Sequence, residues 1–181
     1  MRTFIAVEFN DELKNHMDGL AKYISKYSKT GNFTRRDNYH LTLRFIGETP
    51  TSDIELLCEA IQETAVRNEG FELFLSELGE FKRESKSVVW AGIKDDKREL
   101  SRLASSLEKS LELQGFPRDK KKFSPHITLG REVSLIRDLK YFEDYIKTPI
   151  IIPFKKISLM ESVRIGPNLV YKRVFCSDLK K

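Results

Sequence analysis

Hydrophobic positions along the chain switch repeatedly between a strand-like period of two residues and a helical period. Thr3–Phe9 has the pattern of a strand, and the apolar residues after Asn10 recur at helical spacing, with Asn10 as the N-cap. Tyr39–Ile46 is a second predicted strand, and Ser52 or Asp53 caps a second predicted helix. The chain is therefore predicted to open with strand, helix, strand and helix.

Similar patterns continue through the middle of the chain. Phe71–Phe81 and Ser87–Ile93 are predicted to pair as strands, and an apolar stripe that ends at Gly115 predicts a third helix. Phe123–Leu129 has the pattern of another strand, and residues 135–146 that of a weaker helix.

Turn residues mark the remaining boundaries. Thr30-Gly31-Asn32 is predicted to be a turn. Ile150–Met160 and Leu169–Ser177 are predicted to form a closing hairpin through Gly166-Pro167-Asn168. Strands that alternate with helices indicate an α/β or α+β domain in which helices pack on sheet faces.

The composition narrows the class of protein. With 181 residues, 40% of them hydrophobic and 33% charged, the chain can bury a core, which excludes disordered, fibrous and disulfide-scaffold proteins. No stretch has linker composition, so residues 1–181 are expected to form one domain and a monomer. A net charge of +5 permits a polyanionic partner without requiring one.

The sequence shows no strong sign of a signal peptide, a membrane span or a cysteine-based site. The N-terminal apolar run is too short for a signal peptide, and no segment approaches the roughly 20 apolar residues of a membrane span. We therefore expect a cytoplasmic protein that does not enter a membrane. Cys58 and Cys176 have neither metal-site nor disulfide spacing, and both are expected to be reduced thiols, with Cys58 in the core.

One short motif occurs twice, about half a chain length apart. His40-Leu41-Thr42-Leu43 and His126-Ile127-Thr128-Leu129 both fall in predicted strands that follow a helix. Because side chains alternate along a strand, each motif offers an imidazole and a hydroxyl on one face and buries its aliphatic residues on the other. Phe45 falls on the aliphatic face. Two pseudo-symmetric lobes would bring the histidine strands together across a central groove.

The paired histidines allow three interpretations. Both imidazoles could be structural, bonded to the backbone, although the matched pair makes this less attractive than for one histidine. Zinc would need three or four ligands, and neither motif contains Cys, Asp or Glu, so no metal or other cofactor is expected. The third histidine, His16, lacks such a context and is assigned to structure or solvent.

Acid–base chemistry is the remaining interpretation. An unperturbed pKa of about 6.5 lets one imidazole accept a proton while the other donates one. The threonine hydroxyls can donate hydrogen bonds to anionic oxygens, which suggests a phosphodiester. A strained 2′,3′-cyclic phosphate fits well, because in-line displacement places its two proton transfers on opposite sides of phosphorus.

These residues resemble a known family. The N-terminal Arg2–Val7, the run from His40 to Gly47 and the run from Pro125 to Arg131 are similar over essentially the whole chain to two-histidine phosphoesterases. Within that superfamily they are most similar to RNA 2′,3′-cyclic phosphodiesterases, also called the 2′-5′ RNA ligase family. The resemblance implies an α+β fold: two pseudo-symmetric lobes of mainly antiparallel sheet, with outer helices flanking a central groove.

The resemblance also implies roles for individual residues. His40 matches the proton donor to the leaving 3′ oxygen, and His126 the proton acceptor that activates water. Thr42 and Thr128 match the threonines that hold the phosphate. Arg131 matches a basic residue found after the second motif in many members, but strict alternation puts it on the Leu129 face. It reaches the groove only if the strand ends or bulges near Gly130.

Weaker signals point to RNA. Basic residues precede both motif strands, as contact with a phosphate backbone requires, although without the motifs ordinary surface charge would be the favoured explanation. These residues are Arg35, Arg36, Arg118, Lys120, Lys121 and Lys122. Five aromatic residues are candidate stacking surfaces, with Phe45 and Trp90 favoured for the core and Tyr171 for the rim; the others are Tyr39 and Phe123.

The predicted function is the hydrolysis of RNA ends, or of cyclic nucleotides, that carry a 2′,3′-cyclic phosphate. Ligase activity in the same groove is the mechanistic neighbour, since microscopic reversibility permits it. A non-catalytic nucleotide- or RNA-binding module is the alternative from another class. The sequence alone leaves open which histidine is the acid.

Overall fold

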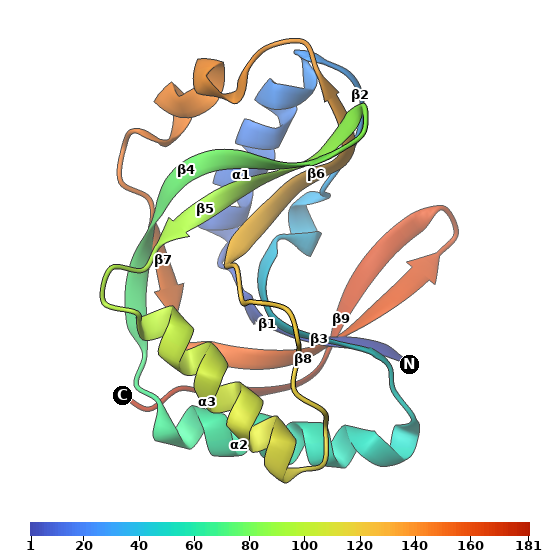
Figure 1. Ribbon diagram of the computed structural model, residues 1–181, viewed down its shortest axis with the longest axis vertical. Helices are drawn as coiled ribbons and strands as arrows, with labels where there is room; N and C mark the ends of the chain where they lie inside the picture. The colour runs from blue at the N-terminus through green and yellow to red at the C-terminus, as the bar shows by residue number, and fades with distance from the viewer.

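The computed structural model describes all 181 residues and combines two antiparallel sheets with α- and 3₁₀-helices (Figure 1). The strands are β1 (Arg2–Glu8), β2 (Ser28–Phe33), β3 (His40–Glu48), β4 (Phe71–Arg83), β5 (Lys86–Lys94), β6 (His126–Leu135), β7 (Ile151–Phe154), β8 (Lys156–Ile165) and β9 (Asn168–Asp178). The α-helices are α1 (Asp11–Ser25), α2 (Ile54–Arg67) and α3 (Glu99–Leu113), and the 3₁₀-helices are η1 (Arg36–Asn38), η2 (Thr51–Asp53) and η3 (Leu139–Ile146). The predicted α+β fold is confirmed.

The two sheets carry one histidine strand each. Sheet A has the order β3-β1-β8-β9, and sheet B has the order β2-β6-β5-β4-β7. The β3–β1 pair and the β6–β5 pair are therefore equivalent, because in each a histidine strand lies antiparallel to the strand that precedes the intervening helix. The predicted duplication is thus present in the topology.

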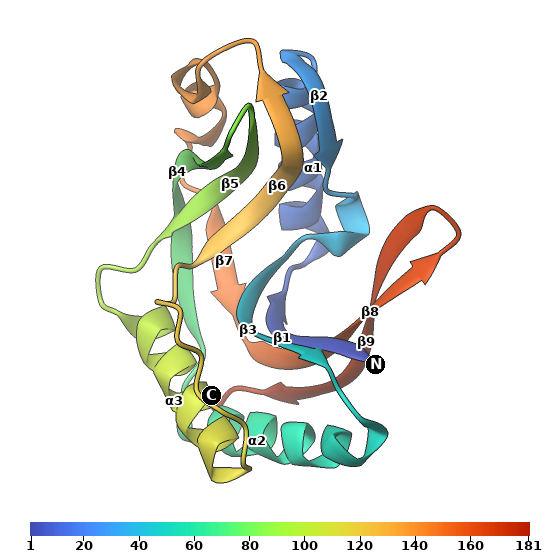
Figure 2. The ribbon, with the colours of Figure 1, turned by 45° about the vertical axis from the view of Figure 1, so that its right-hand side comes forward.

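The helices do not all pack on the sheet of the strand that they follow. α1 follows β1 of sheet A, but it packs on β2 and β6 of sheet B. α3 connects β5 and β6 of sheet B, yet it packs beside α2, which contacts β8 and β9 of sheet A (Figure 2). One cluster of 34 buried residues draws on both sheets. Sheet B is therefore covered by α1, whereas sheet A is covered by α2, and α3 packs on α2 and reaches β3 through the Arg44–Glu108 ion pair.

Local signals explain why the elements form where they do. The Asn10 side chain accepts a hydrogen bond from the Leu13 amide at 2.9 Å and caps α1, as predicted. The apolar stripe of α1 is buried along its length, since Leu13, Met17, Leu20, Ala21 and Ile24 all belong to the core. Gly166, at a φ of 59°, makes the turn between β8 and β9, whose hairpin projects from the body of the molecule (Figure 1).

The prediction for Ile150–Met160 was wrong in one respect. The segment contains two strands that belong to different sheets, because β7 pairs with β4 in sheet B and β8 pairs with β1 in sheet A. The chain thus crosses from one sheet to the other at Lys155. A continuous apolar pattern does not reveal such a crossing, since β7 is buried at Ile152 and Phe154 and β8 is buried over Ile157–Met160 only a few residues later.

Three smaller predictions also need correction. Thr30-Gly31-Asn32 lies in β2, an edge strand paired with β6, whose polar and largely exposed sequence resembles a turn. The second histidine strand begins at His126 and runs to Leu135, so Phe123 lies outside it. The helix expected over 135–146 is a 3₁₀-helix that begins at Leu139. None of the helices is long and apolar enough to cross a bilayer.

Candidate active site

One cavity of about 720 Å³ lies between β3 and β6. The predicted site residues all line it: His40, Thr42, His126, Thr128, Arg131 and Tyr171. The two histidines start their strands, so the two sheets present them from opposite sides of the same cavity. Residues far apart in the chain therefore meet in one place.

Both histidine strands bulge at the same position in the motif. The register of β3 against β1 skips Leu43, and the register of β6 against β5 skips Leu129. An extra residue reverses the alternation beyond it, so Phe45 and Arg131 turn onto the histidine face. Both residues are exposed and line the cavity. Arg131 was expected to reach the groove only if the strand bulged near Gly130, and the strand does bulge there. The prediction of Phe45 as a core residue was wrong, since its side chain is 49% exposed.

The backbone fixes both imidazoles in the same way. His40 Nδ1 lies 2.7 Å from the Asn38 carbonyl oxygen, and His126 Nδ1 lies 2.8 Å from the Ser124 carbonyl oxygen. A carbonyl oxygen only accepts, so each Nδ1 carries a hydrogen and donates it. In the neutral rings Nε2 is then the free base, and His40 Nε2 lies 3.0 Å from the Thr42 hydroxyl, which donates to it.

Aromatic rings flank each histidine. The His40 ring contacts Phe4 at 4.9 Å and the edge of Tyr171 at 5.1 Å between ring centroids. The His126 ring contacts Phe81 at 5.2 Å and Trp90 at 6.3 Å. Trp90 was favoured for the core, but its side chain is only half-buried and one part of it contacts the His126 ring. These contacts hold both rings in place and keep bulk water from one side of each.

Burial sets the charge state of His40. Loss of solvent lowers the pKa of His40 to about 4, and the positive charges of Arg131 and His126 act in the same direction. The backbone bond to Asn38 and the carboxylate of Glu8 oppose this without reversing it. His40 is therefore a neutral imidazole at pH 7 in the free protein.

Glu8 itself is held ionised beside His40. Burial raises the pKa of Glu8, but hydrogen bonds from Arg173 and Ser158 outweigh this and keep the pKa below its usual value. Arg173 binds the carboxylate through two nitrogens, at 2.6 and 2.9 Å. A fixed negative charge therefore lies behind His40, on the strand position opposite it.

Other predicted residues lie elsewhere. Tyr39 is 2% exposed and cannot stack on a ligand, because the residue before the motif points into the core. Arg36 is paired with Asp11 and Asp37. His16 packs against Tyr145 away from the cavity, in keeping with the structural assignment. Cavity residues that motif reading missed include Arg2, Phe4, Thr34, Asn38, Glu48, Ser162 and Arg164.

Two histidines presented by matching strands of an internally repeated fold line one cavity, with hydroxyls and an arginine beside them. Comparison with known proteins shows to which family such a chain belongs. Residues 9–164 match the 2′-5′ RNA ligase superfamily, and the chain belongs to that family.

Curated relatives cover nearly the whole chain. An RNA 2′,3′-cyclic phosphodiesterase of Thermotoga maritima is 30% identical over 178 residues, which span 97% of this chain and 94% of that protein. One of Archaeoglobus fulgidus is 34% identical over 132 residues, 72% of each chain. The crystal structure of Escherichia coli LigT complexed with 3′-AMP superposes with a TM-score of 0.80 at 25% identity, covering 99% of this chain and 98% of that one.

Proposed function

We propose that this protein hydrolyses the 2′,3′-cyclic phosphate ends of RNA to 2′-phosphomonoesters. The observation that carries the proposal is the pair His40 and His126, whose rings line one cavity and whose Nδ1 atoms are both bound to backbone carbonyls. Relatives named RNA 2′,3′-cyclic phosphodiesterases, similar over most of the chain, support the same reaction.

The reaction needs two proton transfers on opposite sides of phosphorus. His126 Nε2 accepts a proton from water as the water oxygen bonds to phosphorus. The bond from phosphorus to the 3′ oxygen breaks, and His40 Nε2 donates the proton that this oxygen takes up. The 2′-phosphomonoester remains. The family resemblance assigns the acid to His40 and the base to His126, and the facing positions of the two strands support a transfer from each side.

Binding of the phosphate prepares the acid. Thr42, Thr128 and Arg131 supply hydroxyl and guanidinium donors for the non-bridging oxygens. In the free protein His40 is neutral, and the positive charge of Arg131 helps to keep it so. A bound phosphate anion offsets that charge, raises the pKa of His40 and allows it to carry the proton for the leaving oxygen.

Aromatic side chains at the cavity wall are suited to the terminal nucleoside. Phe45 is exposed, and the Arg2 guanidinium lies 5.3 Å from its ring centroid. Tyr171 forms another part of the wall. Bases stack on such rings without regard to sequence. We propose that Phe45 and Tyr171 position the terminal base and ribose.

Incubation of the chelated protein with a 2′,3′-cyclic nucleotide or a cyclic-ended oligonucleotide tests the function directly. We expect a 2′-phosphate product, and we expect the activity to persist in the presence of a chelator. We further propose that residues 1–181 form a single domain, that the protein is cytoplasmic, and that it is a monomer, which light scattering would test. Binding without turnover would instead identify an RNA-binding module. With a 5′-hydroxyl RNA added, a 2′-5′ linked product would show that the same cavity also catalyses ligation.

A further inference from the structure

The end of β3 carries a second bulge beyond the one at Leu43. The register of β3 against β1 skips Ile46, and the residue that follows, Gly47, has a φ of 100°, which favours glycine. This extra residue reverses the alternation of side chains once more. Glu48 therefore lies on the same face as Phe45 and lines the cavity, whereas without the second bulge the two side chains would point to opposite faces.

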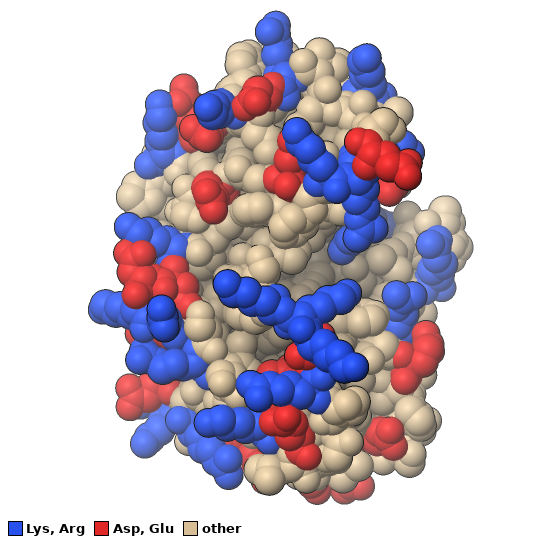
Figure 3. All heavy atoms as spheres, in the orientation of Figure 1, with Lys and Arg blue, Asp and Glu red and all other residues tan.

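Glu48 shares its end of the cavity with two other charged residues. Arg2 is opposite Glu48 in the β1–β3 ladder, and Arg164 comes from the β8–β9 hairpin; both line the cavity. All three side chains are exposed, and none of them forms an ion pair. Figure 3 shows a hollow on the front face, where Figure 1 has β3 beside β6, with Lys and Arg side chains on its rim.

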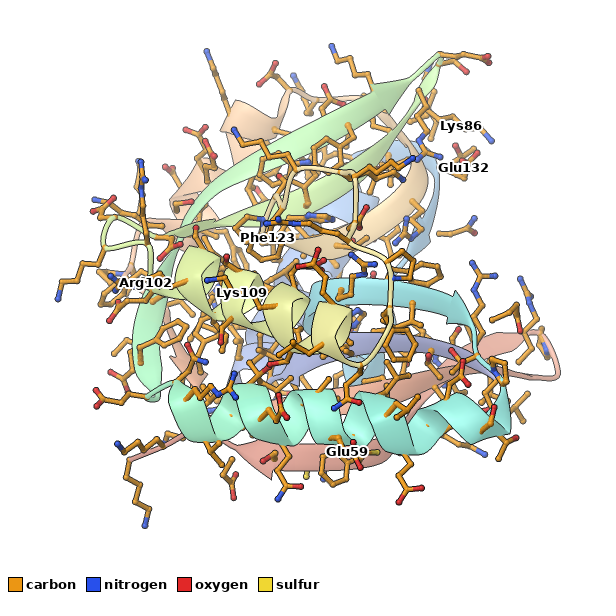
Figure 4. The ribbon with its side chains drawn as sticks, turned by 60° about the horizontal axis from the view of Figure 1, so that its bottom comes forward. Glu59, Lys86, Arg102, Lys109, Phe123 and Glu132 are labelled. Carbon is orange, nitrogen blue, oxygen red and sulfur yellow. The ribbon has the colours of Figure 1, made fainter.

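Exposed neighbours on adjacent strands do pair elsewhere in this protein. Lys86 of β5 and Glu132 of β6, both labelled in Figure 4, form an ion pair of 3.1 Å. The Arg2 guanidinium instead lies over the Phe45 ring, 5.3 Å from its centroid. The Glu48 carboxylate is thus a free acceptor in a cavity whose other charges suit an anion. Since a carboxylate repels phosphate, Glu48 is suited to a part of the ligand that donates hydrogen bonds.

This end of the cavity adjoins the position of the terminal nucleoside. The Phe4 ring contacts the His40 ring at 4.9 Å, and Phe4 is opposite Phe45 in the β1–β3 ladder. Two aromatic residues therefore lead from His40 to the guanidinium of Arg2. The proposed reaction places the leaving 3′ oxygen, and with it the ribose, on the His40 side. The base is then directed along β3, towards Phe45 and the charged residues beyond it.

Among the four bases, guanine matches this set of side chains best. Its N1–H and 2-amino group are adjacent donors that one carboxylate can accept together, and its O6 and N7 are acceptors for a guanidinium. Adenine and cytosine have a ring-nitrogen acceptor next to the amino group, and uracil has one N–H between two carbonyl oxygens. Each of these bases would turn at least one acceptor towards Glu48. A second phosphate would be repelled by the same carboxylate.

We propose that Glu48 and Arg2 form a guanine subsite, so that the protein prefers cyclic ends whose terminal nucleoside is guanosine. Glu48 accepts hydrogen bonds from N1 and the 2-amino group, and Arg2 donates to O6 while the base lies against Phe45. This inference rests on the proposed function, because it takes the cyclic phosphate to lie between the two histidines.

The test compares kcat/KM for the 2′,3′-cyclic phosphates of guanosine, adenosine and inosine. The wild-type protein is expected to favour guanosine over adenosine by about 5- to 150-fold, the discrimination of one bidentate contact to a base. Inosine differs from guanosine only in lacking the 2-amino group, so its kcat/KM should be about tenfold lower than that of guanosine.

Glu48→Ala is expected to bring the guanosine-to-inosine ratio of kcat/KM to about one, because the acceptor of the 2-amino group is gone. This ratio isolates the contact, since the loss of a negative charge near the phosphate acts on both nucleotides alike. The matched control is Glu72→Ala, which removes an exposed, unpaired carboxylate from β4, outside the cavity, and should keep the wild-type ratio.

Three results would overturn the subsite: equal kcat/KM for guanosine and adenosine in the wild type, a wild-type guanosine-to-inosine ratio in Glu48→Ala, or the same loss of that ratio in Glu72→Ala. If the wild-type protein hydrolyses none of the three nucleotides, the proposed function fails instead. Calorimetry with guanosine 2′-phosphate and adenosine 2′-phosphate then tests the subsite alone. Tighter binding of the guanosine compound that Glu48→Ala abolishes supports it, and equal binding of the two refutes it.

Discussion

The titration of His40 tests the electrostatics of the cavity most directly. Its pKa is about 4 in the folded protein, against 6.5 for an exposed imidazole. Below pH 6.5 the His40 imidazole is therefore protonated in the unfolded chain but still neutral in the folded protein. The free energy of unfolding consequently falls as the pH drops from about 6.5 towards 4. At pH 5 this difference corresponds to about 2 kcal/mol lost relative to neutral pH.

Denaturant unfolding of wild type and His40→Asn at neutral pH and at pH 5 measures this loss. The variant is expected to lose about 2 kcal/mol less than the wild type between the two conditions. His16→Asn is a second test of the same argument: burial also lowers the pKa of His16, so this variant should lose acid sensitivity in the same direction. Nuclear magnetic resonance of the imidazole protons, with and without a 2′-phosphorylated nucleotide, gives the value itself. A free-protein pKa near 6.5, or a variant with wild-type acid sensitivity, would refute the burial argument.

Four further predictions concern the reaction and the support of its site. His40→Ala or His126→Ala is expected to lower turnover by roughly 10²–10⁴ with folding intact by circular dichroism, and the wild-type pH profile to be bell-shaped; full activity in either variant would remove the acid–base assignment. Thr128→Val removes one charge-assisted hydrogen bond, so kcat/KM should fall by only about tenfold, and a loss as large as that of the histidine variants would contradict the phosphate-holding role. Gly79 leaves space for the ring of Trp90, the single tryptophan of the chain. Gly79→Ala should therefore lower the free energy of unfolding by about 1–3 kcal/mol and shift the tryptophan fluorescence emission. Unchanged unfolding and emission would show that the indole has room to move. Turnover should survive chelation, and activity that is lost to a chelator and restored by Zn²⁺ would exclude a reaction driven by the histidines alone.

Much of the fold follows from local pattern because helices and strands with one buried face carry a periodic signal. The N-cap of α1, its buried stripe and the β8–β9 turn were all readable in this way. Sheet membership was not, because it depends on long-range pairing. The packing of α1 on sheet B also leaves no local trace, since either sheet offers an apolar face to an amphipathic helix.

The candidate site was readable for a different reason: its chemistry is concentrated in two short motifs that the fold repeats. What strict alternation missed was the bulge at Leu43, and with it the place of Phe45. The matching bulge at Leu129 gives Arg131 the same position in the other half. Each strand thus delivers an imidazole, a hydroxyl and, just after the bulge, one residue that differs between the halves, and β3 adds Glu48 at its end. That difference, an aromatic ring on one side and a guanidinium on the other, makes an otherwise symmetric groove suited to a substrate with a base at one end and a phosphate at the other.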